Sequence, residues 1–469
     1  MNIHVKSIVS AFAFSLLFYS KSLGLNLLLI SIVIVTLVKT INNIRPTPWR
    51  YAIGYIASAV FVFINPSVLS IFVHFMVLLL FIGKSISHKT SVYISWLIGC
   101  ITLFISSAAN YIQLKENRTE SENPKEKDIS PQLINRIKGG LVAILLLFTF
   151  GLLYRNANPV FENLIEQINL DFISIPWLFF TFLGYVLFLH ILRPFDSKEL
   201  IAFDLSQSNF LEKPTELVLI GEKQKLESES TLGSIIFFSL NLLLVFFLVT
   251  DVIYLLQNTK ITNSEYSQSV HQGVYALMFS IVCAIALILY FFRGNLNFYK
   301  KNQRIKSLTY LWIVLNITLV VFTWYKNHLY IEALGLTYKR IGVFIYLLLT
   351  LTGLITAYLK IVKIRSFTFL LRTNIATIFT MLFISAAIPW DKTITWFNLS
   401  AIEKPDIFYL TDLGANNSEQ LFNYANDYPH RINSELKEIV QKKHADFLED
   451  QAEKTWQEYT IYQIVNTNK

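Results

Sequence analysis

Apolar residues in this chain are gathered into long runs that are separated by short polar stretches. The runs are about 14 to 25 residues long, which is the length of helix that crosses the apolar core of a bilayer. Transmembrane β-strands would alternate apolar and polar residues, whereas continuous runs satisfy their backbone in lipid as helices. The pattern predicts an all-α integral membrane protein with about 12 transmembrane helices. The candidate runs are residues 7–20, 23–38, 51–64, 68–83, 92–109, 139–154, 173–192, 232–256, 270–292, 308–325, 341–359 and 367–388.

Three polar stretches divide these runs into regions. A linker of mixed charge at residues 110–136 separates the first five runs from the last seven. The loop at 194–231 contains the short apolar run Glu216–Ile220, which has the composition of a β-strand. The expected regions are an N-terminal membrane region at 1–110, a charged linker at 111–137, a core membrane domain at 138–389 and a soluble helical tail at 390–469.

The first run follows Lys6 and has the length of a signal-peptide core. No small-x-small cleavage motif follows it, and Lys21 leads directly into the second run, so we expect a retained first helix. The first four runs are short, and each needs flanking residues or a thin bilayer to span.

The tail after Pro389 has helical spacing and an acidic balance. Asn417 or Ser418 can cap a helix from Glu419, and the segment 427–429 ends that helix. A second helix is predicted from apolar residues near helical spacing. These residues are Ile432, Leu436, Ile439, Val440 and Phe447. An acidic tail is a poor ligand for an anionic membrane surface, so we expect it to pack on the protein's own loops.

Composition supports the membrane assignment. Charged residues make up 15% of the chain, against about a quarter in soluble domains. The net charge of +8 comes from basic residues in loops, without a basic patch interleaved with aromatics, so no nucleic-acid partner is expected. Cys100 and Cys283 lie inside apolar runs, which argues against a disulfide framework or a thiolate metal site.

The distribution of lysine and arginine predicts an orientation. With twelve helices, the loops after the odd-numbered runs contain twice as many basic residues as the other set, which places them in the cytoplasm and the tail outside it. Five basic residues of the first half contradict this assignment. They are Lys39, Arg45, Arg50, Lys84 and Lys89. Either one early helix is miscounted or these residues are tolerated outside.

Four polar features lie at the ends of the later runs, and helix parity places all four at one membrane face. They are Asp251 near the end of its run and the segments 154–161, 266–275 and 330–340. By charge count this face is extracytoplasmic. The candidate ligand-binding or proton-coupling residues are Asp251, His271, Tyr275, Glu332, Arg340, Arg155 and Asn158.

The ionisable groups in these features suggest specific chemistry. Asp251 and Glu332 can accept protons or bind cations, and His271 titrates near neutral pH. Arg155 and Arg340 can hold an anionic head group or neutralise the carboxylates. Ionisable groups at membrane depth are functional candidates by default.

Each candidate also has a structural interpretation. Asp251 can reach water from its place near a helix end. Glu332 and Arg340 can pair with each other and only fix their loop. His74 and His190 lie inside apolar runs, where we expect histidines with satisfied hydrogen bonds.

The motifs of several enzyme classes are absent from the sequence. There is no GxxxxGK[ST] phosphate loop, no HExxH zinc motif and no GxSxG nucleophile elbow. No catalytic residue, metal or cofactor is predicted, and an enzymatic function is left open but less favoured.

Several of these segments resemble a bacterial multi-pass membrane family, the domain of unknown function 4173, with a relative numbered 4153. The resemblance rests on 266–275, on 330–337 with Arg340 behind it, on 154–161 and on 409–414. It covers residues 139–425 and leaves the first five runs uncovered. It implies a bacterial cytoplasmic membrane location and supplies no mechanism.

Three functional hypotheses follow. The favoured one is binding or transport of a small solute, ion or lipid head group by the polar cluster. The second is a membrane enzyme acting on a lipid-linked or envelope substrate, with Asp251 or Glu332 as general base. The third is a sensor or assembly subunit that contacts membrane-protein partners through its acidic tail.

Overall fold

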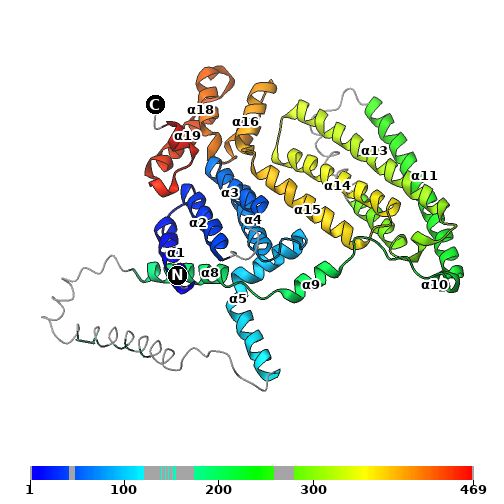
Figure 1. The fold of residues 1–469 in the computed structure, drawn as a ribbon. Helices are drawn as coiled ribbons and strands as arrows, with labels where there is room; N and C mark the ends of the chain where they lie inside the picture. Colours follow the sequence, from blue (N-terminus) through cyan, green and yellow to red (C-terminus); the bar gives the residue numbers. More distant parts are fainter. Residues whose placement is uncertain are drawn as a thin grey trace. The chain divides into compact units, whose positions relative to one another are not determined.

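The computed structural model describes residues 3–41, 48–120, 174–257 and 279–466, with isolated positions between 139 and 154 (Figure 1). The described segments are mostly helical. Their β-structure consists of one isolated antiparallel bridge between Phe210 and Arg365. For these segments the prediction of an all-helical fold is confirmed.

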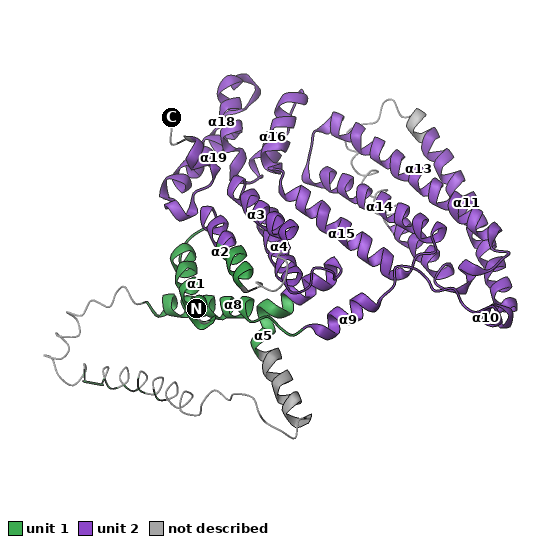
Figure 2. Ribbon diagram, in the orientation of Figure 1, with its two compact units in different colours: residues 1–22, 33–43, 100–196 green, residues 23–32, 44–99, 197–469 purple. Residues whose placement is uncertain are grey.

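The chain divides into two compact units, which Figure 2 distinguishes by colour. Unit 1 comprises residues 1–22, 33–43 and 100–196, and unit 2 comprises 23–32, 44–99 and 197–469. Two helices contribute residues to both units. They are α2 (Leu25–Ile41) and α5 (Val92–Glu120).

Unit 1 contains a pair of antiparallel helices, α1 (Ile3–Phe18) and α8 (Ile175–Leu192). Tyr19, just after α1, places its hydroxyl 3.0 Å from the Ser174 hydroxyl that precedes α8. Gly184 lies where the helices approach closely, because a Cβ at this position would press on side chains of α1. Small residues at helix contacts are typical of membrane packing.

Unit 2 contains most of the apolar helices of the described chain. They are α3 (Trp49–Ile64), α4 (Val68–Ile86), α11 (Lys223–Gln257), Phe279–Phe291, α13 (Gln303–Leu334), α14 (Tyr338–Val362) and α15 (Phe367–Ala386). Shorter elements connect them: α9 (Lys198–Ser206), α10 (Glu216–Gly221) and the 3-10 turn η1 (Asn295–Phe298).

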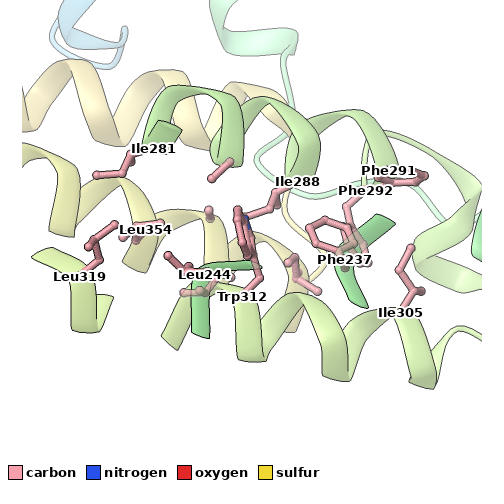
Figure 3. Packing of buried hydrophobic residues seen from close by; sticks show 14 of the residues in the cluster. Phe237, Leu244, Ile281, Ile288, Phe291, Phe292, Ile305, Trp312, Leu319 and Leu354 are labelled. Atoms are coloured by element: carbon pink, nitrogen blue, oxygen red, sulfur yellow. The ribbon is translucent and has the colours of Figure 1, made fainter. Parts of the chain in front are cut away.

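The largest apolar core lies between α11, the helix Phe279–Phe291, α13 and α14 (Figure 3). Phe237, Phe292 and Ile305 are fully buried in it. Gly233 allows α11 to approach, because a Cβ there would overlap Ile305. The outward faces of the same helices stay apolar, as lipid-facing helices require.

Six helices in the described segments are long and apolar enough to cross a membrane. They are Val68–Ile86, Ile175–Leu192, Lys223–Ile253, Gln303–Leu334, Tyr338–Val362 and Phe367–Ala386. The other apolar helices found there are shorter: Ile3–Phe18, Leu25–Thr40, Trp49–Ile64, Val92–Ser107 and Phe279–Phe291. Every predicted run within the described ranges coincides with one of these helices, but the count of about 12 spans is not confirmed.

Two local predictions can be compared with the structure. The β-like run Glu216–Ile220 was predicted wrongly, because it forms helix α10. The carbonyl of Thr215 accepts hydrogen bonds from the amides of Val218 and Leu219, which closes a helical turn, and periodicity cannot separate strand from helix in so short a run.

The two buried histidines have hydrogen-bond partners, as their structural interpretation predicted. His190 Nε2 lies 2.6 Å from Ser107 Oγ, and its Nδ1 lies 2.7 Å from Leu103 O. His74 Nδ1 lies 3.0 Å from Ser58 Oγ, which is within hydrogen-bond distance.

The tail folds into short helices around a core of its own, and its predicted helical character is confirmed. Its helices are α16 (Trp390–Ala401), α17 (Ile407–Thr411), α18 (Ser418–Asp427), α19 (Ser434–Glu453) and α20 (Ile461–Asn466). Ile394, Leu410, Leu421 and Val440 are buried together with Ile341 from the first turn of α14. The tail therefore packs on the end of a long apolar helix.

The helix α18 begins beside Asn417, but the Asn417 side chain makes no capping hydrogen bond. Its amide instead donates to Thr395 Oγ1 (2.8 Å) and to Leu410 O (2.9 Å). A residue predicted as a cap thus ties three helices of the tail together.

The helices of unit 2 have two distinct ends. At the end called here the tail end, the α3–α4 turn and the α13–α14 turn meet the tail. Asn416 Nδ2 donates to Asn65 Oδ1 (2.6 Å), and Leu336 N donates to Asn398 Oδ1 (2.6 Å).

At the opposite end, called the basic end, the α4–α5 turn meets α9 and the start of α15. Asp204 of α9 accepts hydrogen bonds from Ser91 N (2.6 Å) and from Arg372 Nη2 (3.2 Å). The α14–α15 turn joins this end, because Leu211 N donates to Ile364 O (3.1 Å).

These contacts correct the predicted grouping of the basic residues. Lys84 and Lys89 belong to the α4–α5 turn region, so they lie at the same end as Lys360 and Lys363 rather than opposite them.

Candidate functional site: a polar cleft at the α13–α14 turn

The turn between α13 and α14 is held in one conformation by Gly335 and Asn398. Gly335 has φ +85°, a region that favours glycine, and a Cβ there would overlap the Asn398 side chain. Asn398 Oδ1 accepts from Leu336 N (2.6 Å), while its Nδ2 donates to Leu336 O (2.9 Å). This amide pair joins the turn to α16 of the tail.

Arg340 braces the same turn from the first turn of α14. Its Nη1 donates to Gly335 O, and its guanidinium lies 4.0 Å from the centre of the Tyr330 ring. Asn327 Nδ2 donates to the Arg340 carbonyl (3.1 Å). One guanidinium donor of Arg340 therefore helps to hold the turn, and its charge lies against a carbonyl and an aromatic face.

Above this turn lies a cleft of about 780 Å³, called here the polar cleft. The end of α13, the start of α14, α16 and the α16–α17 connection form its walls. Its charged lining residues are Glu332, Arg340, Glu403, Lys404 and Asp406. Three carboxylates face two cations across this cleft.

Glu332 lines the polar cleft as an exposed side chain. Its Oε1 lies 3.3 Å from His328 Nε2, one helical turn earlier on α13. The pairing of Glu332 with Arg340 that the sequence left open is not among the ion pairs in the described chain, since Glu332 pairs with His328. An exposed pair of this kind contributes little stability, so Glu332 can exchange His328 for a ligand.

Asp251 does not line the polar cleft. It forms an ion pair with Lys326 of α13, and both residues lie within candidate membrane spans. Lys326 precedes Glu332 by six residues, or about 9 Å along the helix axis. The structure thus brings Asp251 to the same end of the bundle as Glu332 and Arg340, as a separate ion pair.

The remaining predicted site residues, Arg155, Asn158, His271 and Tyr275, lie outside the described residues. So does most of the predicted linker at 111–137. In the described ranges, no group of three or more His, Cys, Asp or Glu residues could hold a metal ion.

The tail supplies site residues that the sequence reasoning missed. Tyr409 OH accepts a hydrogen bond from Tyr338 N (3.1 Å), and Tyr338 OH donates to Asp391 Oδ1 (2.7 Å). Burial raises the pKa of Tyr409, so this phenol is neutral at physiological pH. Asp391 had one available signal, its position directly after Pro389–Trp390 at the start of a helix, where a carboxylate is favourable.

Asn398 and the residues around Asp406 had no such signal. Asn398 reaches a backbone position 62 residues away, and a single asparagine in a helix of mixed polarity does not indicate such a contact. Asp406 caps α17 by accepting from Tyr409 N (3.0 Å), a local role that says nothing of the cleft it lines.

The chain is thus a helical protein with several apolar helices, consistent with a membrane protein. The family model described as "Domain of unknown function (DUF4153)" matches residues 7–424, so the chain belongs to this family. The match is to the family that the sequence suggested only as the relative, and it begins far earlier than residue 139, including the N-terminal helices. No curated protein matches the chain significantly, and no solved structure does.

Proposed function

We propose that the protein is a multi-pass protein of a bacterial cytoplasmic membrane, with the basic end in the cytoplasm and the tail end outside. The support is the grouping of lysine and arginine at one end of unit 2, which the positive-inside rule associates with the cytoplasm. These residues include Lys84, Lys89, Lys198, Arg293, Lys301, Arg304, Lys360, Lys363, Arg365 and Arg372.

At the tail end, the polar cleft binds a small solute, ion or lipid head group that carries positive charge. The observation that carries this proposal is the lining of the cleft: three carboxylates against two cations, one of which, Arg340, is committed to Gly335 and Tyr330. The remaining lysine, Lys404, leaves the balance acidic. A cavity of about 780 Å³ is within the size range of small-molecule sites.

Asp251 and Lys326 would couple binding to movement across the membrane. Their ion pair joins α11 to α13 within candidate spans, and α13 also ends in the polar cleft. Ionisable groups at such depth commonly serve ion or proton pathways. This role makes transport, rather than binding alone, the fuller form of the proposal.

Ligand-induced stabilisation tests the binding proposal. The full-length protein in nanodiscs would be heated with Na⁺, K⁺, Mg²⁺, ethanolamine or spermidine while its tryptophan fluorescence is followed. A ligand that binds the folded state at 100 times its Kd stabilises by about 2.7 kcal/mol. We expect at least one of these cations to raise the midpoint of the native protein, and the triple variant Glu332→Gln, Glu403→Gln, Asp406→Asn to lose that response.

The matched control is the double variant Glu419→Gln, Asp427→Asn, which removes tail carboxylates that do not line the cleft. This control should respond like the native protein. Equal responses of the native protein and the triple variant, or no response to any of the five cations, would contradict the proposal.

A further inference from the structure

A second cleft lies on the other side of the α14 N-terminus. Its volume is about 740 Å³, and it is called here the amphiphilic cleft. The α3–α4 turn, the start of α4, the start of α16 and α19 contribute to its lining. Its charged lining residues are Asp391, Asp450 and Lys454, none of which lines the polar cleft.

Asp391 forms the polar floor of this cleft. The residue is 8% exposed, and its carboxylate accepts a hydrogen bond of 2.7 Å from Tyr338 OH. No Lys, Arg or His in the described chain forms an ion pair with it. Lys443 lies near enough to Asp391 for the two charges to attract, but its ammonium donates hydrogen bonds to the carbonyls of Thr411 and Leu413.

A buried carboxylate with a phenol as its partner is energetically unfavourable unless a cation compensates it. Gly414 packs closely against Asp391, because a Cβ there would overlap Asp391 Oδ2. A ligand ammonium in the cleft would bring a positive charge into direct contact with this carboxylate and donate hydrogen bonds to it.

Lys454 places a positive charge in the same cleft. Its Nζ lies 3.1 Å from Asp450 Oδ2, and the exposed fractions of the two side chains are 13% for Lys454 and 65% for Asp450. Because Asp450 lies largely in water, its hold on Lys454 is weak, and an anionic group of a ligand in the cleft can take its place beside Lys454. The cleft therefore offers one buried negative charge and one exchangeable positive charge.

The third part of the cleft is an apolar wall on α4. Val68 and Phe72 lie in the first turns of this candidate membrane span and are 87% and 51% exposed. Exposed apolar side chains at the end of a span lie at the level where lipid chains meet head groups. The cleft thus opens from a charged floor onto a surface suited to acyl chains.

We propose that the amphiphilic cleft binds an aminophospholipid of the phosphatidylethanolamine class. The ammonium group pairs with Asp391, the phosphate pairs with Lys454, and the acyl chains lie along Val68 and Phe72. An anionic lipid fits this cleft less well, because its head group would bring negative charge to the buried Asp391 carboxylate. The site is independent of the polar cleft, because the two share no charged residue.

Native mass spectrometry of the full-length protein tests this proposal. The protein would be released from micelles containing equal amounts of phosphatidylethanolamine, phosphatidylglycerol and phosphatidylcholine, and the retained lipids counted. We expect native protein to retain phosphatidylethanolamine preferentially. Asp391→Asn, which keeps an acceptor for Tyr338, should reduce that preference about tenfold, as the loss of 1.4 kcal/mol would.

Two further variants separate the head-group charges from a general effect on folding. Lys454→Gln should weaken retention of phosphatidylethanolamine several-fold without disturbing the buried floor. The triple variant of the polar cleft should retain the lipid like native protein. Equal retention of the three lipids by native protein, or an unchanged preference in both Asp391→Asn and Lys454→Gln, would overturn the proposal.

Discussion

Two buried aspartates at opposite ends of unit 2 have very different surroundings. At the basic end, Asp204 is 1% exposed and is bound by Ser91 N, by Ser91 Oγ (2.9 Å) and by Arg372. At the tail end, Asp391 is 8% exposed and is bound by Tyr338 OH. The first carboxylate has a cation among its partners and the second lines a cleft.

The difference separates a structural role from a binding role. Asp204 joins the α4–α5 turn, α9 and α15, and its hydrogen bonds leave little capacity for anything else. Asp391 forms no ion pair in the described chain and lines a cleft. Asp204 and Asp391 are both buried aspartates, so the partners of each carboxylate distinguish the structural role from the binding role.

The largest expected effect is the loss of stability when the Asp204 carboxylate is removed. Asp204→Ala leaves the Arg372 guanidinium and the Ser91 amide without their carboxylate, so we expect a loss of about 3–5 kcal/mol in stability. Chemical unfolding in micelles measures it. Asp391→Ala is the matched comparison and should cost clearly less, because it removes a buried charge that has no ion-pair partner. If Asp204→Ala and Asp391→Ala lost the same stability, the two aspartates would not differ in role.

The second effect concerns the turn that shapes the polar cleft. Gly335→Ala forces a residue with Cβ into φ +85° and against Asn398, so we expect a cost of about 1–3 kcal/mol. Gly342→Ala in α14 is the control, since open space surrounds that position and alanine favours the helix. If both variants have the same thermal midpoint, the turn is not held as described.

The third effect concerns the ion pair between α11 and α13. A double-mutant cycle with Asp251→Asn and Lys326→Gln should give a coupling energy of about 0.5–3 kcal/mol. Its measurement requires unfolding curves of the native protein, the two single variants and the double variant in the same micelles. A coupling energy of zero would show that Asp251 and Lys326 act independently.

The smallest effect is a pH dependence in the tail. Burial lowers the pKa of Lys443 from 10.5, while Asp391 and Asp412 oppose the shift. The unfolded chain therefore binds this proton more tightly, and native protein gains stability relative to Lys443→Met as pH rises toward 10.5. Thermal midpoints of both proteins at pH 8 and pH 10 measure the gain. A native midpoint that falls relative to that of Lys443→Met between these pH values would contradict the sign.

The sequence predicted local structure far better than it predicted assembly. Apolar runs gave the long helices, and the spacing of Leu436, Val440 and Phe447 gave α19. The number of about 12 spans stays a prediction, since six helices of the described segments are long and apolar enough to cross a membrane. Helix parity placed Lys84 and Lys89 opposite Lys360 and Lys363, whereas contacts between segments distant in the sequence place them at one end.

Sequence reasoning reached the residues of the polar cleft only where they are neighbours in the chain. Glu332 and Arg340 lie together because a tight turn separates them, and this proximity is local in sequence. Asn398 and Asp391 reach the turn through packing of the tail on α14, and Ile341 inside the tail core is the contact that fixes it. Such long-range packing leaves no periodic signal.

The central claim is that the α3–α4 turn and the tail share one membrane face, opposite the basic end. Single cysteines at Ser67→Cys, Lys404→Cys, Lys89→Cys and Lys301→Cys, in a Cys100→Ser, Cys283→Ser background, test it with an impermeant maleimide on spheroplasts. The first two should be labelled directly, and the last two after permeabilisation. Labelling of Lys89→Cys together with Lys404→Cys, with Ser67→Cys protected, would contradict the account.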